Sequence, residues 1–220
     1  MRGTFRGRVW RAPAAAHTMY GSHVNTGRKN NVDAMTTDAF HLDLPDWVRD
    51  EIDGARRYAD DDAKVALAIR LALRNVEHDS GGPFGAAVFA ADGRLVSAGV
   101  NRVLPRSCSI AHAEIMAYAL AQARLQRARL NETGERFTLA TSAQPCCQCY
   151  GATIWAGVDE ILIGARSEDV EELTEFDEGP LPADWIGELE KRGIAVRRDI
   201  LRDDARAVFL RYRERGGRGY

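Results

Sequence analysis

The chain has 220 residues, of which 45% are hydrophobic and 28% are charged, and its formal net charge is −2. This length is enough for one well-packed domain and too short for two large ones. No apolar run approaches the roughly 20 residues that a membrane-spanning helix needs, so we expect no membrane partner.

Basic residues are concentrated at the N-terminus. Residues 1–34 contain six Lys or Arg and one acidic residue, whereas the rest of the chain contains 24 basic and 31 acidic residues, a net charge of −7. A domain with this charge is a poor general binder of nucleic acid. Because residues 1–34 show no sustained apolar period, we predict a disordered or mis-called extension, with Met19 or Met35 as the alternative start to Met1. An Arg-rich targeting peptide is a further interpretation.

The four cysteines are Cys108, Cys146, Cys147 and Cys149, so three of them lie in one short cluster. Cysteines with this spacing do not indicate a disulfide framework, and a protein without one fits the reducing environment of the cytosol. We therefore expect a cytoplasmic protein.

The N-terminal half is predicted to form an arm over residues 35–60 and the first part of a single domain over residues 61–220. Hydrophobic periodicity indicates helices, and two apolar runs joined at Asp92-Gly93 indicate a hairpin. The expected elements are helices over 47–58 and 63–77 and strands over 84–91 and 95–100.

The C-terminal half alternates strands and helices beyond a predicted loop over residues 101–111. The helix that opens at His112 and the cysteine cluster both follow strand ends, where ligand sites of α/β sheets usually lie. The expected elements are helices over 112–124, around Val170, over 185–192 and over 203–213, and strands over 137–141, 160–165 and 194–197. This order predicts a three-layer α/β/α sandwich around a mixed sheet of about five strands.

The segment His112-Ala113-Glu114 is followed, 33 residues after the histidine, by Pro145-Cys146-Cys147-Gln148-Cys149. This H-x-E…P-C-x-x-C pattern is typical of zinc nucleobase deaminases. His112, Cys146 and Cys149 provide three zinc ligands, which leaves the fourth tetrahedral position for water, as in catalytic zinc sites. Glu114 follows the ligand histidine closely enough to take up and pass on a proton of that water. We therefore predict Zn²⁺ as the cofactor and Glu114 as a catalytic residue.

A lone C-x-x-C pair also fits a redox site or half of a structural zinc knuckle. No second C-x-x-C or H-x-H pair is present in the sequence to complete a four-ligand site. Cys108 is expected to pack as a small buried side chain or to line the pocket, and Cys147 would point about 100° away from Cys146 on a helix. A zinc-stabilised binding or redox module without turnover would tolerate loss of Glu114, whereas a deaminase would not.

Four further features accompany the zinc motif: Gly81-Gly82-Pro83-Phe84, Asn101 eleven residues before the ligand histidine, Phe176-Asp177-Glu178-Gly179-Pro180, and the terminal Tyr220. With them, the chain from about Ala63 onwards resembles the bacterial guanine deaminases of the cytidine deaminase superfamily, in particular the branch that also acts on triazines such as ammeline. The resemblance implies zinc-dependent hydrolysis of guanine to xanthine and ammonia, a purine or triazine base as the partner, and a domain-swapped homodimer.

The same resemblance implies roles for individual residues. Phe84 would line the purine pocket, Asn101 and backbone amides near Ala113 would hold the base, and Glu178 would be a second catalytic carboxylate. Tyr220 would close the active site of the partner subunit. Simpler alternatives are a core phenylalanine, a turn asparagine, a solvated loop carboxylate and a frayed chain end.

Two positions leave the substrate open. Trp155, six residues after Cys149, is a candidate for substrate binding that faces either the pocket or only the sheet. Gln144 stands where the family usually has a glutamate, which would change the electrostatics of the pocket or the choice of substrate. The same chemistry would also serve ammeline, guanosine, cytosine or an adenosine in tRNA, of which the tRNA requires a basic rim to hold its phosphates.

Overall fold

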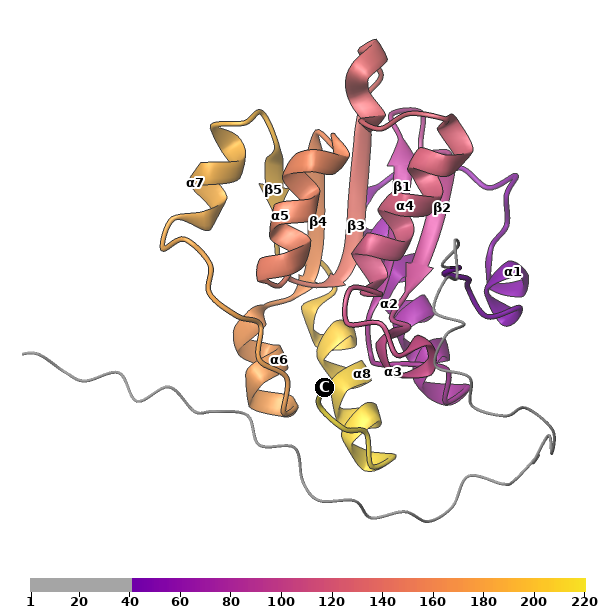
Figure 1. Ribbon diagram of the computed structural model, residues 1–220, viewed down its shortest axis with the longest axis vertical. Helices are drawn as coiled ribbons and strands as arrows, with labels where there is room; N and C mark the ends of the chain where they lie inside the picture. Colours follow the sequence, from indigo (N-terminus) through magenta and orange to yellow (C-terminus); the bar gives the residue numbers. More distant parts are fainter. Residues whose placement is uncertain (1–40) are drawn as a thin grey trace, which may run out of the picture. The chain divides into compact units, whose positions relative to one another are not determined.

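The computed structural model describes residues 41–220, which form a sheet covered by helices on both faces (Figure 1). The strands are β1 (Gly85–Ala90), β2 (Leu95–Val100), β3 (Phe137–Ala143), β4 (Glu160–Ala165) and β5 (Ala195–Arg197). Their order is β2-β1-β3-β4-β5; β1 is antiparallel to β2 and β3, whereas β3, β4 and β5 run parallel. The predicted mixed five-stranded sheet is confirmed. The predicted extension over residues 1–34 lies outside the described residues.

Each face of the sheet has its own apolar core, because successive strand residues point to opposite sides. Ala87 and Phe89 of β1 pack in the core beneath α2 (Asp61–Glu77) and α8 (Arg202–Glu214). Ala86 and Val88 pack in the opposite core, beneath α4 (Ala113–Leu125) and α5 (Cys147–Ala156). These cores hold in place α4 and α5, the helices that carry the zinc-motif residues.

The close packing of α4 on β2 depends on Gly99. A Cβ atom at this position would lie 2.1 Å from the carbonyl oxygen of Ala113 and 2.5 Å from the amide nitrogen of Ala117. Only glycine therefore allows the first turn of α4 to lie this near the sheet. This approach places the start of α4 beside the end of β2, where the zinc-motif histidine lies.

Two expectations about the N-terminal half are wrong. The helix predicted over 47–58 is only α1 (Trp47–Glu51), because Ile52 is extended and Tyr58 is buried against Phe89 with ring centroids 5.1 Å apart. The loop predicted over 101–111 contains a short helix, α3 (Val103–Arg106), whose first amide donates to the side chain of Asn101. Both differences arise from tertiary contacts that a local pattern does not show.

Of the remaining elements, α6 (Ser167–Leu173) and α7 (Trp185–Glu190) follow the predicted order. A 3-10 helix at Leu130–Thr133 was not predicted. Among the helices of residues 41–220, none combines the length and the apolar character that crossing a bilayer requires.

Candidate active site

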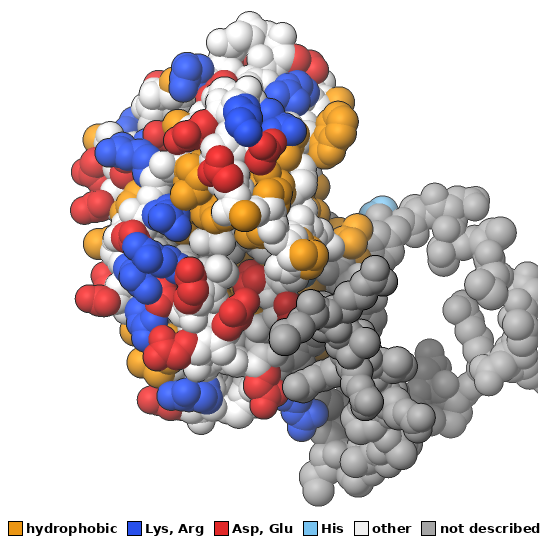
Figure 2. Space-filling model, turned by 90° about the vertical axis from the view of Figure 1, so that its left-hand side faces the viewer, with side chains coloured by type: hydrophobic (Ala, Val, Ile, Leu, Met, Phe, Trp, Pro, Cys, Tyr) orange, Lys and Arg blue, Asp and Glu red, His pale blue; other side chains and the backbone are white. Residues whose placement is uncertain are grey.

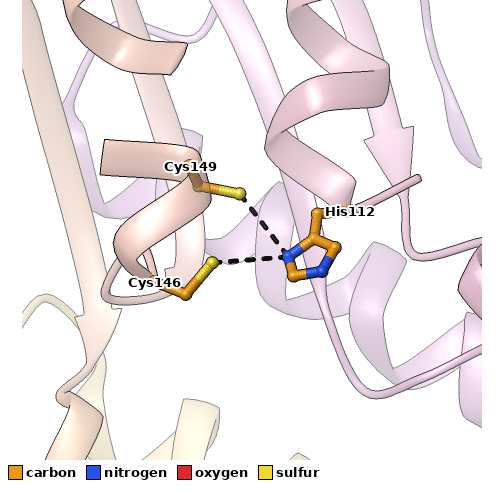
Figure 3. Close-up of side chains that lie close together, drawn as sticks. All are labelled: His112, Cys146 and Cys149. Carbon is orange, nitrogen blue, oxygen red and sulfur yellow. Dashed lines mark hydrogen bonds between the residues drawn. The ribbon is translucent and has the colours of Figure 1, made fainter. Parts of the chain in front are cut away.

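The three predicted metal ligands meet where α4 and α5 begin (Figure 3). His112 is the N-cap residue of α4, Cys146 is the N-cap residue of α5, and Cys149 lies in the first turn of α5. The Sγ atoms of Cys146 and Cys149 lie 3.5 and 3.6 Å from Nδ1 of His112. All three ligand atoms lie within 4.8 Å of one another, so one ion can bind them together.

These distances fit zinc. Tetrahedral zinc binds sulfur at about 2.3 Å and nitrogen at about 2.0–2.1 Å, which separates a sulfur ligand from a nitrogen ligand by about 3.5 Å. The observed separations of 3.5 and 3.6 Å match this edge of the tetrahedron. The donor set of one imidazole and two thiols is also that of known zinc deaminases.

The Cys146 thiol favours its ionised form. A hydrogen bond from the Cys149 thiol outweighs the effect of burial and, with one from His112, lowers the pKa of Cys146 to about 4. The N-terminal end of α5 adds a favourable dipole for a negative charge. Because the thiolate is the form that binds a metal, the site is prepared for a cation.

Two buried carboxyl groups face the same cavity. Glu114 is 6% exposed and Glu178 is 7% exposed. Burial, followed by the negative charge of Cys146, raises the pKa of Glu114 to about 7. Burial, followed by the charges of Cys146 and Glu114, raises the pKa of Glu178 to about 8. Both groups therefore hold a proton far more readily than a solvated carboxylate, as general acids and bases of an active site do.

The cavity has a volume of about 680 Å³, within the range of pockets for small molecules. Phe84 and Phe176 form an apolar wall with ring centroids 5.1 Å apart. Val103, Leu104 and the loop that follows α3 also line the cavity. The pocket thus combines apolar side chains with the metal ligands and the two carboxyl groups.

The side-chain amide of Asn101 has a defined orientation beside this pocket, but the residue is fully buried and does not itself line the cavity. Its Oδ1 accepts hydrogen bonds from the backbone amides of Gly82, at 3.3 Å, and Val103, at 3.2 Å. Its Nδ2 donates to the hydroxyl of Tyr220, which lines the cavity. Because the oxygen is already occupied by backbone donors, Nδ2 is the free end of this buried amide, and in this structure it meets the cavity only through Tyr220.

Comparison with known proteins agrees with this geometry. The family model described as the cytidine and deoxycytidylate deaminase zinc-binding region matches residues 59–165. A guanine deaminase from Nitrosomonas europaea is 44% identical, over 81% of this chain and 98% of that chain, with a TM-score of 0.77. The chain belongs to the guanine deaminase family. The predictions of a zinc-binding nucleobase deaminase and of the cytidine deaminase-like fold are confirmed.

Two further relatives support the assignment. The structure of NE0047 in complex with 2,6-diaminopurine is 45% identical, covers 83% of this chain and 96% of that chain, and has a TM-score of 0.78. The guanine deaminase of Bacillus subtilis (strain 168) is 35% identical over 105 residues, which span 48% of this chain and 64% of that protein. The match to the Bacillus protein thus leaves about a third of its length uncovered.

Most of the expected site residues lie together, with two differences of detail. Phe84 lines the cavity and also packs against Phe209, so its pocket and core positions are not alternatives. The side chain of Ala113 is fully buried in the core under α4, so only its backbone is available to a ligand.

Trp155 does not lie at the pocket. Its side chain is 77% exposed, and it is absent from the residues that line the cavity. Because Trp155 lies six residues past Cys149, at about 100° per residue, its side chain points about 120° away from that of the ligand cysteine around the helix. The expectation of a substrate-binding role for Trp155 is therefore wrong.

Tyr220 reaches the pocket of its own chain, whereas the family resemblance implies a place at the pocket of a partner subunit. Its ring lies 4.8 Å from that of Phe176 and 6.4 Å from that of His112, both in edge-on arrangements. Burial raises its pKa well above the ordinary value for tyrosine. The tail can therefore close the site without an exchange between subunits.

Two glutamines line the pocket, of which Gln144 was singled out from the sequence and Gln148 was not. Gln144 is 4% exposed, lines the cavity and donates from Nε2 to the hydroxyl of Ser167 at 3.1 Å. Gln148 also lines the cavity, and its buried Nε2 has no hydrogen-bond partner among the described residues. A glutamine in a zinc motif gives no signal of its own, because periodicity does not distinguish the pocket from the surface of a helix.

Proposed function

We propose that the protein hydrolyses guanine to xanthine and ammonia. The observation that carries this proposal is the convergence of three zinc ligands and two buried carboxyl groups on one small-molecule cavity. The choice of guanine is supported by the 44% identity to a guanine deaminase over 98% of that chain. The complex of NE0047 with 2,6-diaminopurine shows that a relative of this chain accepts a purine that carries a 2-amino group.

The residues of this chain have separate roles in the proposed reaction. Zinc, when bound by His112, Cys146 and Cys149, supplies a Lewis acid and acidifies water beside the base. Glu114 takes up the proton released as water adds to C2 of guanine and passes it to a ring nitrogen. Its pKa of about 7 suits a group that both accepts and returns a proton near neutral pH.

Departure of the amine requires a second proton transfer. Glu114 or Glu178 donates a proton to the exocyclic nitrogen, which leaves as ammonia. The raised pKa of Glu178, about 8, keeps a proton available at neutral pH. Asn101 donates from Nδ2 to an acceptor of the base, and the Phe84 ring forms one wall of its site. The role of Tyr220 is to exclude water from above the base.

Other substrates of the same chemistry are alternatives to guanine. An adenosine in tRNA would require a basic surface to bind phosphates. On the face drawn in Figure 2, basic and acidic side chains are interspersed over the surface instead of forming a basic stripe. This pattern favours a free base. Ammeline, guanosine and cytosine differ from guanine mainly in size and ring substituents, and only assay separates them.

The deciding experiment measures ammonia release from guanine, guanosine, ammeline, cytosine, adenine and tRNA by the purified protein. We expect guanine to give the highest kcat/KM. Ammonia from cytosine or tRNA but none from guanine would overturn the proposal. The Glu114→Gln variant serves as the control for contaminating deaminases, because it should release none.

We also propose a homodimer in the reducing cytosol. The helix α5 contains no charged residue, and its Trp155 is 77% exposed, which is unusual for a surface that faces only water. The four cysteines are free, as a reducing compartment would keep them. Sedimentation of the parent and of Trp155→Arg tests the dimer. A parent of monomeric mass, or an unchanged dimer in the variant, contradicts the use of this face.

A further inference from the structure

Asn75 is a polar residue in the middle of the apolar face of α2. It is 0% exposed, and its neighbours on the helix, Leu71, Ala72 and Val76, belong to the core. An asparagine is rarely placed in such surroundings without hydrogen-bond partners, because burying an unpaired amide is costly. Its partners therefore indicate why this polar side chain is present.

The two donors of Asn75 hold the two backbone segments beside the pocket. Its Nδ2 lies 2.8 Å from the carbonyl oxygen of Gly82 and 2.9 Å from that of Asn101. The backbone pairing of the two segments ends here, with the hydrogen bond from the Asn101 amide to the carbonyl oxygen of Phe84 at 3.1 Å. One side chain from α2 thus joins the loop before β1 to the end of β2.

The acceptor of Asn75 is also satisfied, so its amide has one orientation. Its Oδ1 accepts a hydrogen bond from the hydroxyl of Ser80 at 2.8 Å. The same hydroxyl accepts from Nε1 of Trp47 at 3.0 Å. Because the two carbonyl oxygens can only accept, Asn75 must present its NH₂ group to them, which turns its Oδ1 towards Ser80. The Ser80 hydroxyl therefore donates to Asn75 while it accepts from Trp47.

The backbones of Gly81 and Asn101 lie so close together that only glycine fits at position 81. A Cβ atom on Gly81 would lie 1.9 Å from the carbonyl oxygen of Asn101 and 2.6 Å from Nδ2 of Asn75. The neighbouring amide of Gly82 donates to Oδ1 of Asn101 at 3.3 Å. A displacement of Gly82 would therefore remove one of the two backbone donors that hold Oδ1 of Asn101.

We propose that Asn75 is a positioning residue for base recognition, acting through Asn101. By fixing the backbones of Gly82 and Asn101, it keeps Oδ1 of Asn101 on backbone donors and directs Nδ2 towards the cavity side, where Tyr220 accepts from it in this structure. This inference rests on the proposed function. It assigns to a core residue of α2, which does not line the cavity, a part of the affinity for the substrate.

The test is a double-mutant cycle between the two asparagines, measured with guanine. Asn75→Asp keeps the size of the side chain and, when protonated, one of its two donors. We expect KM to rise about tenfold, the effect of one misplaced hydrogen bond, with kcat within twofold of the parent. Asn101→Ala should raise KM further. Adding Asn75→Asp to Asn101→Ala should cost nothing more, because the residue through which Asn75 acts is already absent.

Two milder variants guard against a general loss of folding. Ser80→Ala removes only the hydroxyl that orients Asn75, and it should raise KM by a smaller factor than Asn75→Asp. Asn131→Ala is the matched control, because Asn131 also uses its amide to join segments, through Asp159 at 3.0 Å, and does not line the cavity. It should leave KM unchanged. Affinity for 8-azaguanine, measured calorimetrically in a Glu114→Gln background, provides a readout independent of turnover.

The outcomes separate the inference from the proposed function. Penalties of Asn75→Asp and Asn101→Ala that multiply in the double variant, or a change confined to kcat, would show that Asn75 does not act through Asn101. An Asn101→Ala variant with parental affinity for 8-azaguanine would instead refute the proposed binding mode itself. A parent that releases no ammonia from guanine would refute the proposed function, whatever the asparagines do.

Discussion

Glu178 in the pocket and Asp169 in α6 are both buried, at 7% and 1% exposure, but the protein holds their carboxyl groups in opposite states. Burial and the neighbouring negative charges of Cys146 and Glu114 raise the pKa of Glu178 to about 8. Burial also acts to raise the pKa of Asp169, but hydrogen bonds from Arg202, the backbone of Arg166 and Arg206 hold it well below its usual range. The supply of donors, and not burial alone, decides whether a buried carboxyl group keeps its proton.

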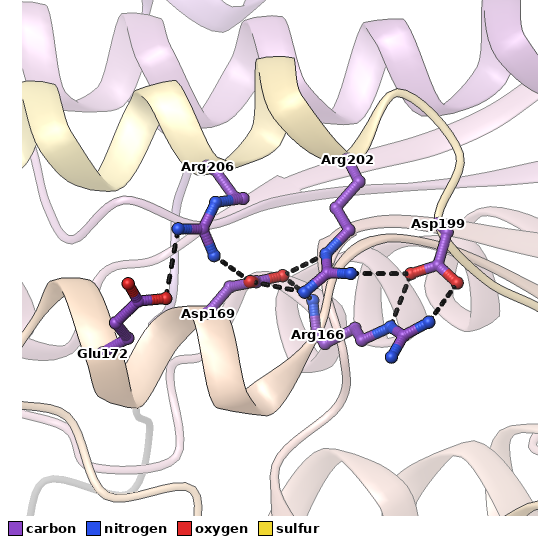
Figure 4. Close-up of polar contacts among 6 residues, drawn as sticks. All are labelled: Arg166, Asp169, Glu172, Asp199, Arg202 and Arg206. Carbon is purple, nitrogen blue, oxygen red and sulfur yellow. Dashed lines mark hydrogen bonds and ion pairs between the residues drawn. The ribbon is translucent and has the colours of Figure 1, made fainter.

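The Asp169 contact joins α6 to α8 (Figure 4). Arg202 binds both carboxylate oxygens at 2.7 Å, Arg206 binds one of them, and the amide of Arg166 donates at 2.8 Å. The chain continues from α6 to Glu178 and from α8 to Tyr220. The paired carboxylate of Asp169 thus stabilises the two helices that lead to the pocket. The carboxyl group of Glu178, which lies in the pocket, has no such arginine partners among the residues that the structure describes.

The largest effect is expected for Glu114→Gln, which keeps the shape of the pocket but cannot carry a proton. We expect kcat for guanine to fall about 1,000-fold or more, as for the loss of a general acid–base group, which corresponds to about 4 kcal/mol. Zinc content, measured by atomic absorption, should equal that of the parent, whereas Cys149→Ala should lose the metal. Activity within tenfold of the parent would remove Glu114 from the mechanism.

Asp169→Asn should have the opposite profile, with a large effect on stability and none on kcat. Asparagine cannot replace the carboxylate that binds Arg202 and Arg206, although each arginine keeps a second acidic partner. We therefore expect the free energy of unfolding at pH 7 to fall by about 2 kcal/mol, the effect of losing hydrogen bonds to a charged group. The native pKa of Asp169 is depressed, so its contribution is present above the unfolded value of about 3.9 and is lost as pH falls through the native value.

Denaturant unfolding of the parent and of Asp169→Asn tests this pH dependence. The difference between the two proteins should be constant from about pH 5 to pH 8 and should shrink below about pH 4, where the unfolded-state carboxyl binds its proton. The exposed ion pair of Lys191 with Glu188 offers a matched control. Glu188→Gln should change stability by well under about 1 kcal/mol. A difference that grows as pH falls would contradict the assigned state of Asp169.

Glu178→Gln should lower kcat by about 100-fold, near the lower end of the range for general acid–base groups, because Glu114 remains to carry protons. Zinc content should hold. Unlike Asp169→Asn, this variant should not be destabilised, because it replaces an unpaired buried carboxyl group by a neutral one. If KM changed and kcat did not, Glu178 would be a binding group and not a catalytic one.

The smallest effect is expected at the tail. Deleting residues 216–220 removes the tyrosine that covers the pocket, and we expect kcat/KM for guanine to fall about tenfold, since water then enters the site. Zinc content and the unfolding midpoint should be unchanged, because few buried apolar groups are lost. Tyr220→Phe, which loses only the hydroxyl bound by Asn101, should have a smaller effect. A truncated protein with parental kcat/KM would show that the tail has no part in turnover.

The sequence by itself determined the features that depend on short spacing. The strand Glu160–Ala165 and the strand Leu95–Val100 have the predicted bounds, because β-branched and apolar residues between turn signals specify them locally. The zinc ligands were also predictable, since the metal imposes residue types and intervals that other sites do not share. The position of Glu178 at the pocket, and that of Asn101 behind Tyr220, came from the family pattern, and their catalytic and binding roles remain predictions.

Only the tertiary structure decided the features that join distant parts of the chain. The contact between Asn101 and Tyr220 spans 119 positions, and that between Asn75 and Asn101 spans 26. Helical periodicity placed Asn75 in α2 but did not distinguish a functional polar group from a defect in the apolar face. It likewise gave no direction for Trp155, which the fold turns towards solvent. Local pattern specifies which element a residue joins, whereas the packing of elements specifies what its side chain meets.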